Sequence, residues 1–512
     1  MQERAGLVRA TTGMAIVTVF SRLSGLLRDK VLAAILGPTE IGDAFTVGFR
    51  APNLFRQLLA EGALHATFIP TLAELEAGGQ RRRSEAFVGA MFSTLLLLLA
   101  AILVLGMLAA EPLAFALAPT YRKDPEKFQQ TVYFTRYLFP YLGFVSLAAL
   151  FQGLLNVSGR FLLPAGTPIA LNLSIASSIL LAKVLGLALP RWLVVGVLVG
   201  GGLQFLLQWA QCLRLGLPVL PGPGAFRNAD VRRVLQKAGP LVFSSGIYPL
   251  TVFLSTNLAA RAGEGAVFCL YVASRVNELV YGVVVVQLFT AALPALASAE
   301  DKPGTLGFAL RLQSALIFPS MFFLLALPQP VIGLLFGGGR FQPWAVELTG
   351  AVLVFLALGM PALALGKLLS GAFYARHETR MPVVGSLIAL STFAIFGSAL
   401  VGVLGVVGIA LALSLSHYAS AFWLWTALRK RGWAPGGKVW YWVRRHGLAG
   451  TVMATPLVLI GRMVTPPQST SAGAAGFVAV MGLLALALYL GMSRLLGAGE
   501  LGEVWNALRG KS

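Results

Sequence analysis

Long apolar stretches without a single charged residue constrain this sequence more than any other feature. They include residues 90–108, 193–207 and 477–490. A helix needs about 20 mostly apolar residues to cross the hydrocarbon core of a bilayer, and these stretches meet or approach that length. Over the whole chain only 12% of residues are charged, about half the share that is usual in a soluble domain. The sequence therefore predicts an all-α polytopic membrane protein.

Hydropathy along the chain predicts about fourteen transmembrane helices. Several of the expected segments exceed 25 residues, which indicates tilted or kinked helices. The expected spans are residues 8–36, 42–73, 85–117, 131–158, 163–186, 190–214, 230–261, 267–297, 306–327, 343–374, 379–402, 404–428, 442–464 and 472–495.

Lys and Arg are distributed unevenly between the two sides of these spans. Loops on one side, together with both termini, hold about 24 of the 40 basic residues, and the opposite side holds about 8, such as Arg122, Lys123, Lys127 and Arg340. Because cytoplasmic loops accumulate basic residues, both termini are predicted to be cytoplasmic, which requires an even number of spans. The same bias accounts for the net charge of +20, so we expect no nucleic-acid partner.

Charged residues also lie within the predicted spans, where a charge at the bilayer centre costs about 2.5–3.5 kcal/mol. Such residues usually face the protein interior or a water-filled cavity. The expected substrate-binding residues are Arg22, Arg28, Arg50, Asn53, Arg56 and Arg275, and the expected gating or cavity acids are Asp29, Asp43, Glu61 and Glu278.

The cations outnumber the acids in this set, and all of them are arginines. A planar guanidinium donates two parallel hydrogen bonds to a phosphate and keeps its charge when desolvated. The pattern therefore favours an anion site, with phosphate or diphosphate preferred to carboxylate. In the alternative interpretation the charges only tie helices together, with Arg28–Asp29 and Arg275–Glu278 as pairs. A voltage sensor would need arginine at every third position of one helix, and that spacing is absent.

Two regions of the chain resemble each other at nearly one offset. Asn53 and Pro70 recur as Asn277 and Pro294, each 224 residues later, and the Gly153–Pro164 spacing recurs 218 residues later. Such repeats are typical of transporters that bind substrate between two rocking lobes. We therefore predict two pseudo-symmetric six-helix lobes around a central cavity, residues 1–220 and 221–435, with two further helices in residues 436–512.

Short motifs spread over nearly the whole chain are recognisable, and those between Ser21 and Pro70 are the most specific. They are Ser21-Arg22 with Arg28-Asp29, Asp43-Ala44-Phe45, Pro52-Asn53-Leu54 with Arg56, Ala60-Glu61-Gly62-Ala63, Phe139-Pro140-Tyr141, Ala273-Ser274-Arg275 and Gly339-Arg340-Phe341. With these motifs the chain resembles the lipid II flippase family (MurJ, also called MviN), within the multidrug/oligosaccharidyl-lipid/polysaccharide exporter superfamily.

This resemblance implies a monomer in the plasma membrane of a bacterium that flips lipid II to the outer leaflet by alternating access. Lipid II, the undecaprenyl-diphosphate-linked peptidoglycan precursor, would enter from the cytoplasmic leaflet. Its diphosphate would meet the arginines matching Arg22, Arg28, Arg56 and Arg275, while Asp43 and Glu61 would order the cavity or a gate. The last two helices would form a hydrophobic groove for the polyprenyl tail.

The sequence leaves the driving force and one class of alternatives open. Some members of the family have acids in the seventh helix that are linked to sodium, but residues 241–257 contain no acid. Membrane potential could drive transport instead. An exporter of another polyprenyl-diphosphate-linked oligosaccharide or of drugs stays an alternative. Scattered histidines and the absence of a His/Asp cluster disfavour an enzyme, a metal site or a cofactor.

Overall fold

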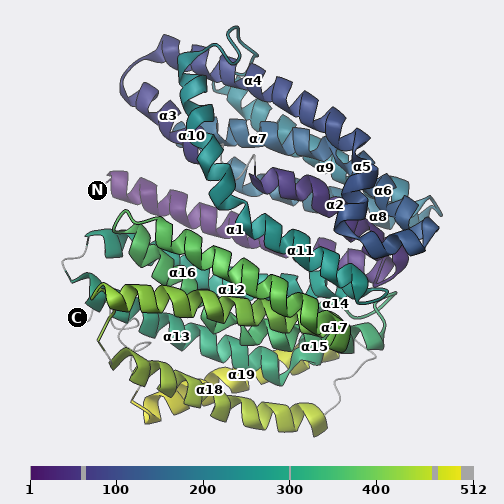
Figure 1. The fold of residues 1–512 in the computed structure, drawn as a ribbon, viewed down its shortest axis with the longest axis vertical. Helices are drawn as coiled ribbons and strands as arrows, with labels where there is room; N and C mark the ends of the chain where they lie inside the picture. The colour runs from purple at the N-terminus through teal and green to yellow at the C-terminus, as the bar shows by residue number, and fades with distance from the viewer. Residues whose placement is uncertain (1, 59–64, 299–300, 437, 464–470, 498–512) are drawn as a thin grey trace. The chain divides into compact units, whose positions relative to one another are not determined.

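The computed structural model describes residues 2–58, 65–298, 301–436, 438–463 and 471–497 (Figure 1). Within these ranges the secondary structure is helical, apart from one isolated β-bridge between Gly338 and Phe341. The predicted all-α polytopic class is thus confirmed. Contacts divide the chain into two compact units, Met1–Val267 and Phe268–Ser512, which are described separately. The division at residues 220 and 435 stays a prediction.

Unit 1 is a bundle in which α8 packs against both α1 and α9, α2 packs on α6, and α7 packs on α9 (Figure 1). A short 3₁₀ helix, η2 (Pro119–Lys123), precedes α6. The helices are α1 (Gln2–Ile35), α2 (Glu40–Arg56), α3 (His65–Ala77), α4 (Arg81–Leu108), α5 (Ala110–Leu117), α6 (Pro125–Leu138), α7 (Pro140–Val157), α8 (Leu162–Val184), α9 (Leu189–Arg214), α10 (Ala229–Ser245) and α11 (Ile247–Arg261).

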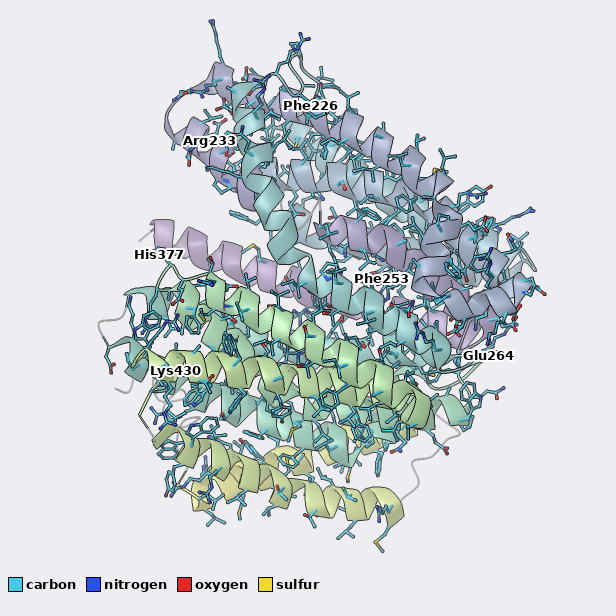
Figure 2. All side chains as sticks on the ribbon, in the orientation of Figure 1. Phe226, Arg233, Phe253, Glu264, His377 and Lys430 are labelled. Atoms are coloured by element: carbon cyan, nitrogen blue, oxygen red, sulfur yellow. The ribbon has the colours of Figure 1, made fainter. Side chains whose placement is uncertain are left out.

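In unit 2, α13 packs on α16 and α18, α17 packs on α15 and α16, and α18 packs on α19. The helices are α12 (Ala266–Ser298), which enters the unit at Phe268, α13 (Lys302–Ala326), α14 (Pro328–Phe336), α15 (Pro343–Leu358), α16 (Met360–Tyr374), α17 (Arg380–Lys430), α18 (Lys438–Met463) and α19 (Ser471–Leu495). His377, which follows α16, and Lys430, which ends α17, lie at the same end of this unit (Figure 2). The adjacent ion pair between Arg431 Nη2 and Glu378 Oε1, at 2.6 Å, holds that end together.

Several expected spans are two helices joined at a break. Pro140 opens α7 directly after α6, and Pro361 lies in the first turn of α16 directly after α15. Proline lacks the N–H that would continue the helical hydrogen bonds, so each helix break falls next to its proline. Eight described segments are long and apolar enough to cross a membrane by length and composition alone. Helices that are shorter or more polar, such as α2 and α10, fall below that threshold.

Gly405 divides α17 into two antiparallel halves. Its φ of 57° and ψ of −139° lie outside the helical region, in a conformation that favours glycine. A Cβ on Gly408 would meet the Leu400 carbonyl at 2.5 Å, so the chain reverses tightly here. The boundary expected between the eleventh and twelfth spans, residue 403, lies two positions away.

Gly405→Ala is expected to lower the unfolding midpoint in detergent, because alanine in this conformation costs about 1–3 kcal/mol. No atom lies within 4 Å of a Cβ built on Gly405, so the loss reflects backbone strain alone. Gly402→Ala is the matched control, since its Cβ is equally unobstructed and its backbone is helical. Equal midpoints for the two variants would show that the turn tolerates an L-residue.

The loop between α9 and α10 is hydrogen-bonded along the side of α4. Gly222 N–H donates to Gly89 O at 2.9 Å, and Ser93 Oγ donates to Gly222 O at 2.8 Å. Phe226 N–H donates to Thr94 Oγ1 at 3.2 Å. A Cβ on Gly89 would lie 3.1 Å from Gly222 Cα, so glycine at both positions permits the close approach of the two backbones. The loop is therefore a fixed part of unit 1.

The start of α10 is fastened to α3 and α4 by ion pairs. Arg83 donates from Nε and Nη2 to the two carboxylate oxygens of Asp230, each at 2.8 Å. Arg233 Nη1 lies 3.2 Å from Glu74 Oε2, and Figure 2 shows Arg233 on the same segment as Phe226. The Asp230 side chain is only 8% exposed, whereas Arg83 is 55% exposed. This two-point contact orients α10 against α4.

Candidate substrate-binding site

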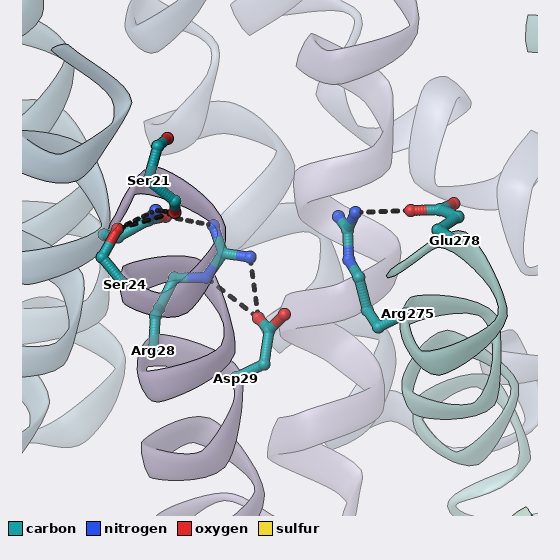
Figure 3. A network of polar contacts seen from close by, with 7 residues as sticks. Ser21, Ser24, Arg28, Asp29, Arg275 and Glu278 are labelled. Atoms are coloured by element: carbon teal, nitrogen blue, oxygen red, sulfur yellow. Dashed lines mark hydrogen bonds and ion pairs between the residues drawn. The ribbon is translucent and has the colours of Figure 1, made fainter. Parts of the chain in front are cut away.

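Arg28 is held by contacts on two helices. Its Nε and Nη2 both donate to Asp29 Oδ1, at 2.9 and 2.7 Å, and its Nη1 donates to Asn172 Oδ1 at 2.9 Å (Figure 3). Asn172, on α8, in turn donates to Ser24 Oγ at 2.9 Å. The side chain of Arg28 is 13% exposed and that of Asp29 is 5% exposed. The packing of α1 against α8 therefore fixes the direction of this guanidinium.

On α2 the predicted residues Asn53 and Arg56 are hydrogen-bonded within their own helix. Arg56 Nε donates to Asn53 Oδ1 at 3.1 Å, and Asn53 Nδ2 donates to Phe49 O at 2.9 Å. Arg50, one turn earlier, is half-buried, as is Arg22 on α1. Glu61, the remaining predicted acid of this segment, lies outside the described residues. The four arginines of unit 1 thus come from two helices, α1 and α2.

Arg275 is the predicted cation of unit 2. Its Nη1 lies 2.8 Å from Glu278 Oε2, one turn along α12 (Figure 3). Its Cζ lies 5.0 Å from the centre of the Tyr271 ring. The side chains of Arg275 and Glu278 remain 40% and 49% exposed. This ion pair is therefore more exposed to solvent than the Arg28–Asp29 pair.

Asp43 forms a buried network with partners that the sequence did not suggest. Its Oδ2 accepts from Lys127 Nζ at 2.9 Å and from Gly265 N–H at 2.8 Å. The side chains of Asp43 and Lys127 are 0% and 7% exposed. Lys127 Nζ also lies 4.2 Å from the centre of the Tyr121 ring. Burial, reinforced by the Asp43 carboxylate, raises the pKa of Tyr121 well above its usual value, so the ring beneath the ammonium stays neutral.

Some of these contacts were expected from the sequence and others were not. The pairs Arg28–Asp29 and Arg275–Glu278, considered as helix ties, are formed in the structure. Asp43 pairs with Lys127, which the charge count had assigned to a loop; α6 begins at Pro125 and buries it in its first turn. Asn172 is uncharged, so the search for charges within the predicted spans did not single it out. The binding and gating roles of the predicted residues stay predictions.

The contacts leave an arrangement suited to holding an anion. Guanidinium groups oriented by carboxylates and amides need little rearrangement to donate hydrogen bonds to phosphate oxygens. Among the described residues no group of three or more His, Cys, Asp or Glu residues could hold a metal ion. The chemistry of these side chains is therefore that of recognition by charge and hydrogen bonding.

Sequence comparisons point to one family. The family model described as "Lipid II flippase MurJ" matches residues 32–475. A lipid II flippase MurJ of Burkholderia cenocepacia is 33% identical over 437 residues, which cover 83% of this chain and 84% of the relative. A probable lipid II flippase MurJ of Rhizobium meliloti is 33% identical over 98% of this chain and 95% of its own length.

Comparison with solved structures gives the same fold. A lipid II flippase MurJ in an inward closed conformation superposes with a TM-score of 0.80 at 22% identity, covering 94% of this chain and 98% of the other. An inward-facing multidrug resistance MATE family transporter of the MOP superfamily superposes with a TM-score of 0.64 at 16% identity, covering 82% and 98%. At these identities the likeness concerns the fold.

Proposed function

The chain belongs to the lipid II flippase MurJ family, and we propose that it flips lipid II from the cytoplasmic to the outer leaflet of the bacterial plasma membrane. This is a family of transporters, not of enzymes. The observation that carries the proposal is the set of arginines on α1, α2 and α12, which lie within the spans predicted from the sequence. In that setting a cation is costly unless it meets an anion.

These arginines are proposed to bind the diphosphate of the substrate. The proposed ligands of the diphosphate are Arg22, Arg28, Arg50, Arg56 and Arg275, with Asn53 orienting Arg56. Arg28 is supported by its three directed hydrogen bonds, which hold the guanidinium in place before the substrate arrives. Asp29 and Glu278 keep the cations charged and oriented, and Asp43 ties α2 to α6. Glu61 belongs to the same proposed set.

The proposed topology of the protein and its proposed driving force rest on where charged residues lie in the sequence. Both termini are proposed to be cytoplasmic, because the basic residues gather on that side. The seventh predicted span carries no acid between residues 241 and 257, so the membrane potential is the proposed driving force, at about 2.3 kcal/mol per charge per 100 mV. The protein is proposed to act as a monomer.

Rescue of growth tests the proposed substrate. The full chain is expressed in a bacterium whose own lipid II flippase can be depleted, and colony formation is counted after depletion. The proposal expects growth close to that of cells that retain their flippase, and none with the empty vector. An immunoblot of the membrane fraction verifies insertion. If the inserted protein gives no growth, the substrate is instead another polyprenyl-diphosphate-linked oligosaccharide.

A further inference from the structure

Basic and aromatic side chains gather where α13 meets α18 in unit 2. The Cζ atom of Arg445 lies 5.1 Å from the centre of the Trp442 ring, and that of Arg311, on α13, lies 5.8 Å from it. Arg445 also lies 4.0 Å from the Tyr441 ring, and Arg311 lies 5.8 Å from the Phe308 ring. Two guanidinium groups from different helices are thus held beside one indole.

The described residues provide no carboxylate for this pair of cations. Arg431, at the same end of the unit, forms an ion pair with Glu378 at 2.6 Å, but no ion pair joins Arg311 or Arg445 to an acid within the described ranges. Contact with a ring occupies the face of a guanidinium and leaves N–H donors at its edge. At Arg445 one of these donors, Nη2, is hydrogen-bonded to Tyr441 Oη. Both guanidinium centres lie within 5.8 Å of one indole centroid, and an anion bound beside that ring would offset the repulsion between the two cations.

An exposed apolar stripe continues from Arg445 along α18. One face of the helix packs on α19: His446 Nδ1 lies 2.9 Å from Tyr489 Oη, and Ala449 and Met453 join the same core. The adjoining face is open, with Leu448, Val452 and Leu459 exposed by 56%, 46% and 57%. From residue 445 to residue 459 a helix rises about 21 Å, somewhat more than one hydrocarbon leaflet of about 15 Å.

We propose that Arg311, Trp442 and Arg445 bind the headgroup of an anionic phospholipid from the surrounding membrane. The phosphodiester accepts hydrogen bonds from the two guanidinium groups, and an acyl chain lies along Leu448, Val452 and Leu459. The charge distribution places this end of unit 2 at the cytoplasmic side, where anionic lipids meet basic residues. The stripe is long enough for an acyl chain that reaches the middle of the bilayer. The cations proposed for the transported substrate lie on other helices, whereas the groove predicted for its polyprenyl tail shares α18 with this site.

Thermal unfolding of the full-length protein in a neutral detergent tests this site. The unfolding midpoint is measured with dioleoyl phosphatidylglycerol and with dioleoyl phosphatidylcholine at equal concentration. In the wild-type protein the anionic lipid is expected to raise the midpoint more than the zwitterionic lipid. The double variant Arg311→Gln/Arg445→Gln is expected to lose at least half of this difference. Arg444→Gln, an exposed neighbour on α18, is expected to keep it.

Two results would overturn the proposal. One is an unchanged difference between the lipids in the double variant; the other is an equal response of the wild type to both lipids. A double variant that responds normally to phosphatidylglycerol but has lost its response to a polyprenyl diphosphate would assign the surface to the substrate. If the glutamine variant fails to fold, Arg311→Lys/Arg445→Lys replaces it. That variant keeps both charges, and a loss of its lipid-specific response shows that the two guanidinium forks are required.

Discussion

Replacing Arg28 with alanine is expected to reduce lipid II flipping at least thirtyfold while the protein still inserts in the membrane. Arg28 donates three hydrogen bonds to acceptors on two helices. Its guanidinium is therefore already oriented before substrate binds. A charge-assisted hydrogen bond contributes about 2 kcal/mol, which corresponds to roughly a thirtyfold change in an equilibrium constant. The measurement is the initial flipping rate of fluorescent lipid II in proteoliposomes, normalised to the protein inserted.

A lysine variant distinguishes the effect of the positive charge at position 28 from that of the planar guanidinium, and a surface variant serves as the control. Arg28→Lys keeps the positive charge but cannot donate to Asp29 and Asn172 from a planar fork, so we expect it to be impaired nearly as much. Arg81→Ala, with a side chain that is 82% exposed at the start of α4, serves as the control and should flip at the wild-type rate. Wild-type flipping by Arg28→Ala would remove Arg28 from the proposed binding site.

Asp43→Asn is expected to be the most destabilising single change at the Asp43 network. The substitution keeps the shape of the side chain but leaves the Lys127 ammonium, whose side chain is 7% exposed, without its countercharge. Removing one partner of a buried ion pair costs about 3–5 kcal/mol. The unfolding midpoint in detergent should therefore fall by several degrees. A midpoint equal to that of the wild type would mean that the ion pair contributes nothing to stability.

A double-mutant cycle tests whether the uncompensated Lys127 ammonium causes the loss of stability in Asp43→Asn. Lys127→Met removes the ammonium and keeps an apolar side chain of similar length in the buried space. The double variant Asp43→Asn/Lys127→Met is expected to unfold at a higher temperature than Asp43→Asn alone, because no buried charge remains uncompensated. Additive losses from the two single variants would point to a general packing defect instead.

The sequence predicted most of the spanning segments because apolar runs and turn residues are local signals. The expected spans 163–186, 190–214 and 267–297 correspond to single helices, α8, α9 and α12, with ends within a few residues. The breaks within spans were harder to place. Pro140 and Pro361 lie within expected spans, yet a proline at the first turn of a new helix and one inside a bent helix give the same apolar pattern.

The candidate site was predictable in part, and the limit has a physical cause. Contacts within one turn, such as Arg275–Glu278, follow from helical spacing. Lys127 and Asn172 reach Asp43 and Arg28 from helices more than eighty residues away in the chain, and no periodicity encodes such contacts. Lys127 was also misplaced because a basic residue beside Asp124 and Glu126 in the sequence is typical of a solvated loop.

The hydrogen-bonded segment between α9 and α10 bears on how the protein can be labelled. The predicted boundary between the first two lobes falls here, and exposed loops at such boundaries tolerate insertion of a fluorescent protein or a protease cleavage site. Here Gly222 and Phe226 are bonded to α4, so an insertion at residue 220 would pull this segment off its helix. A reporter placed at the carboxyl end of the chain leaves those bonds intact.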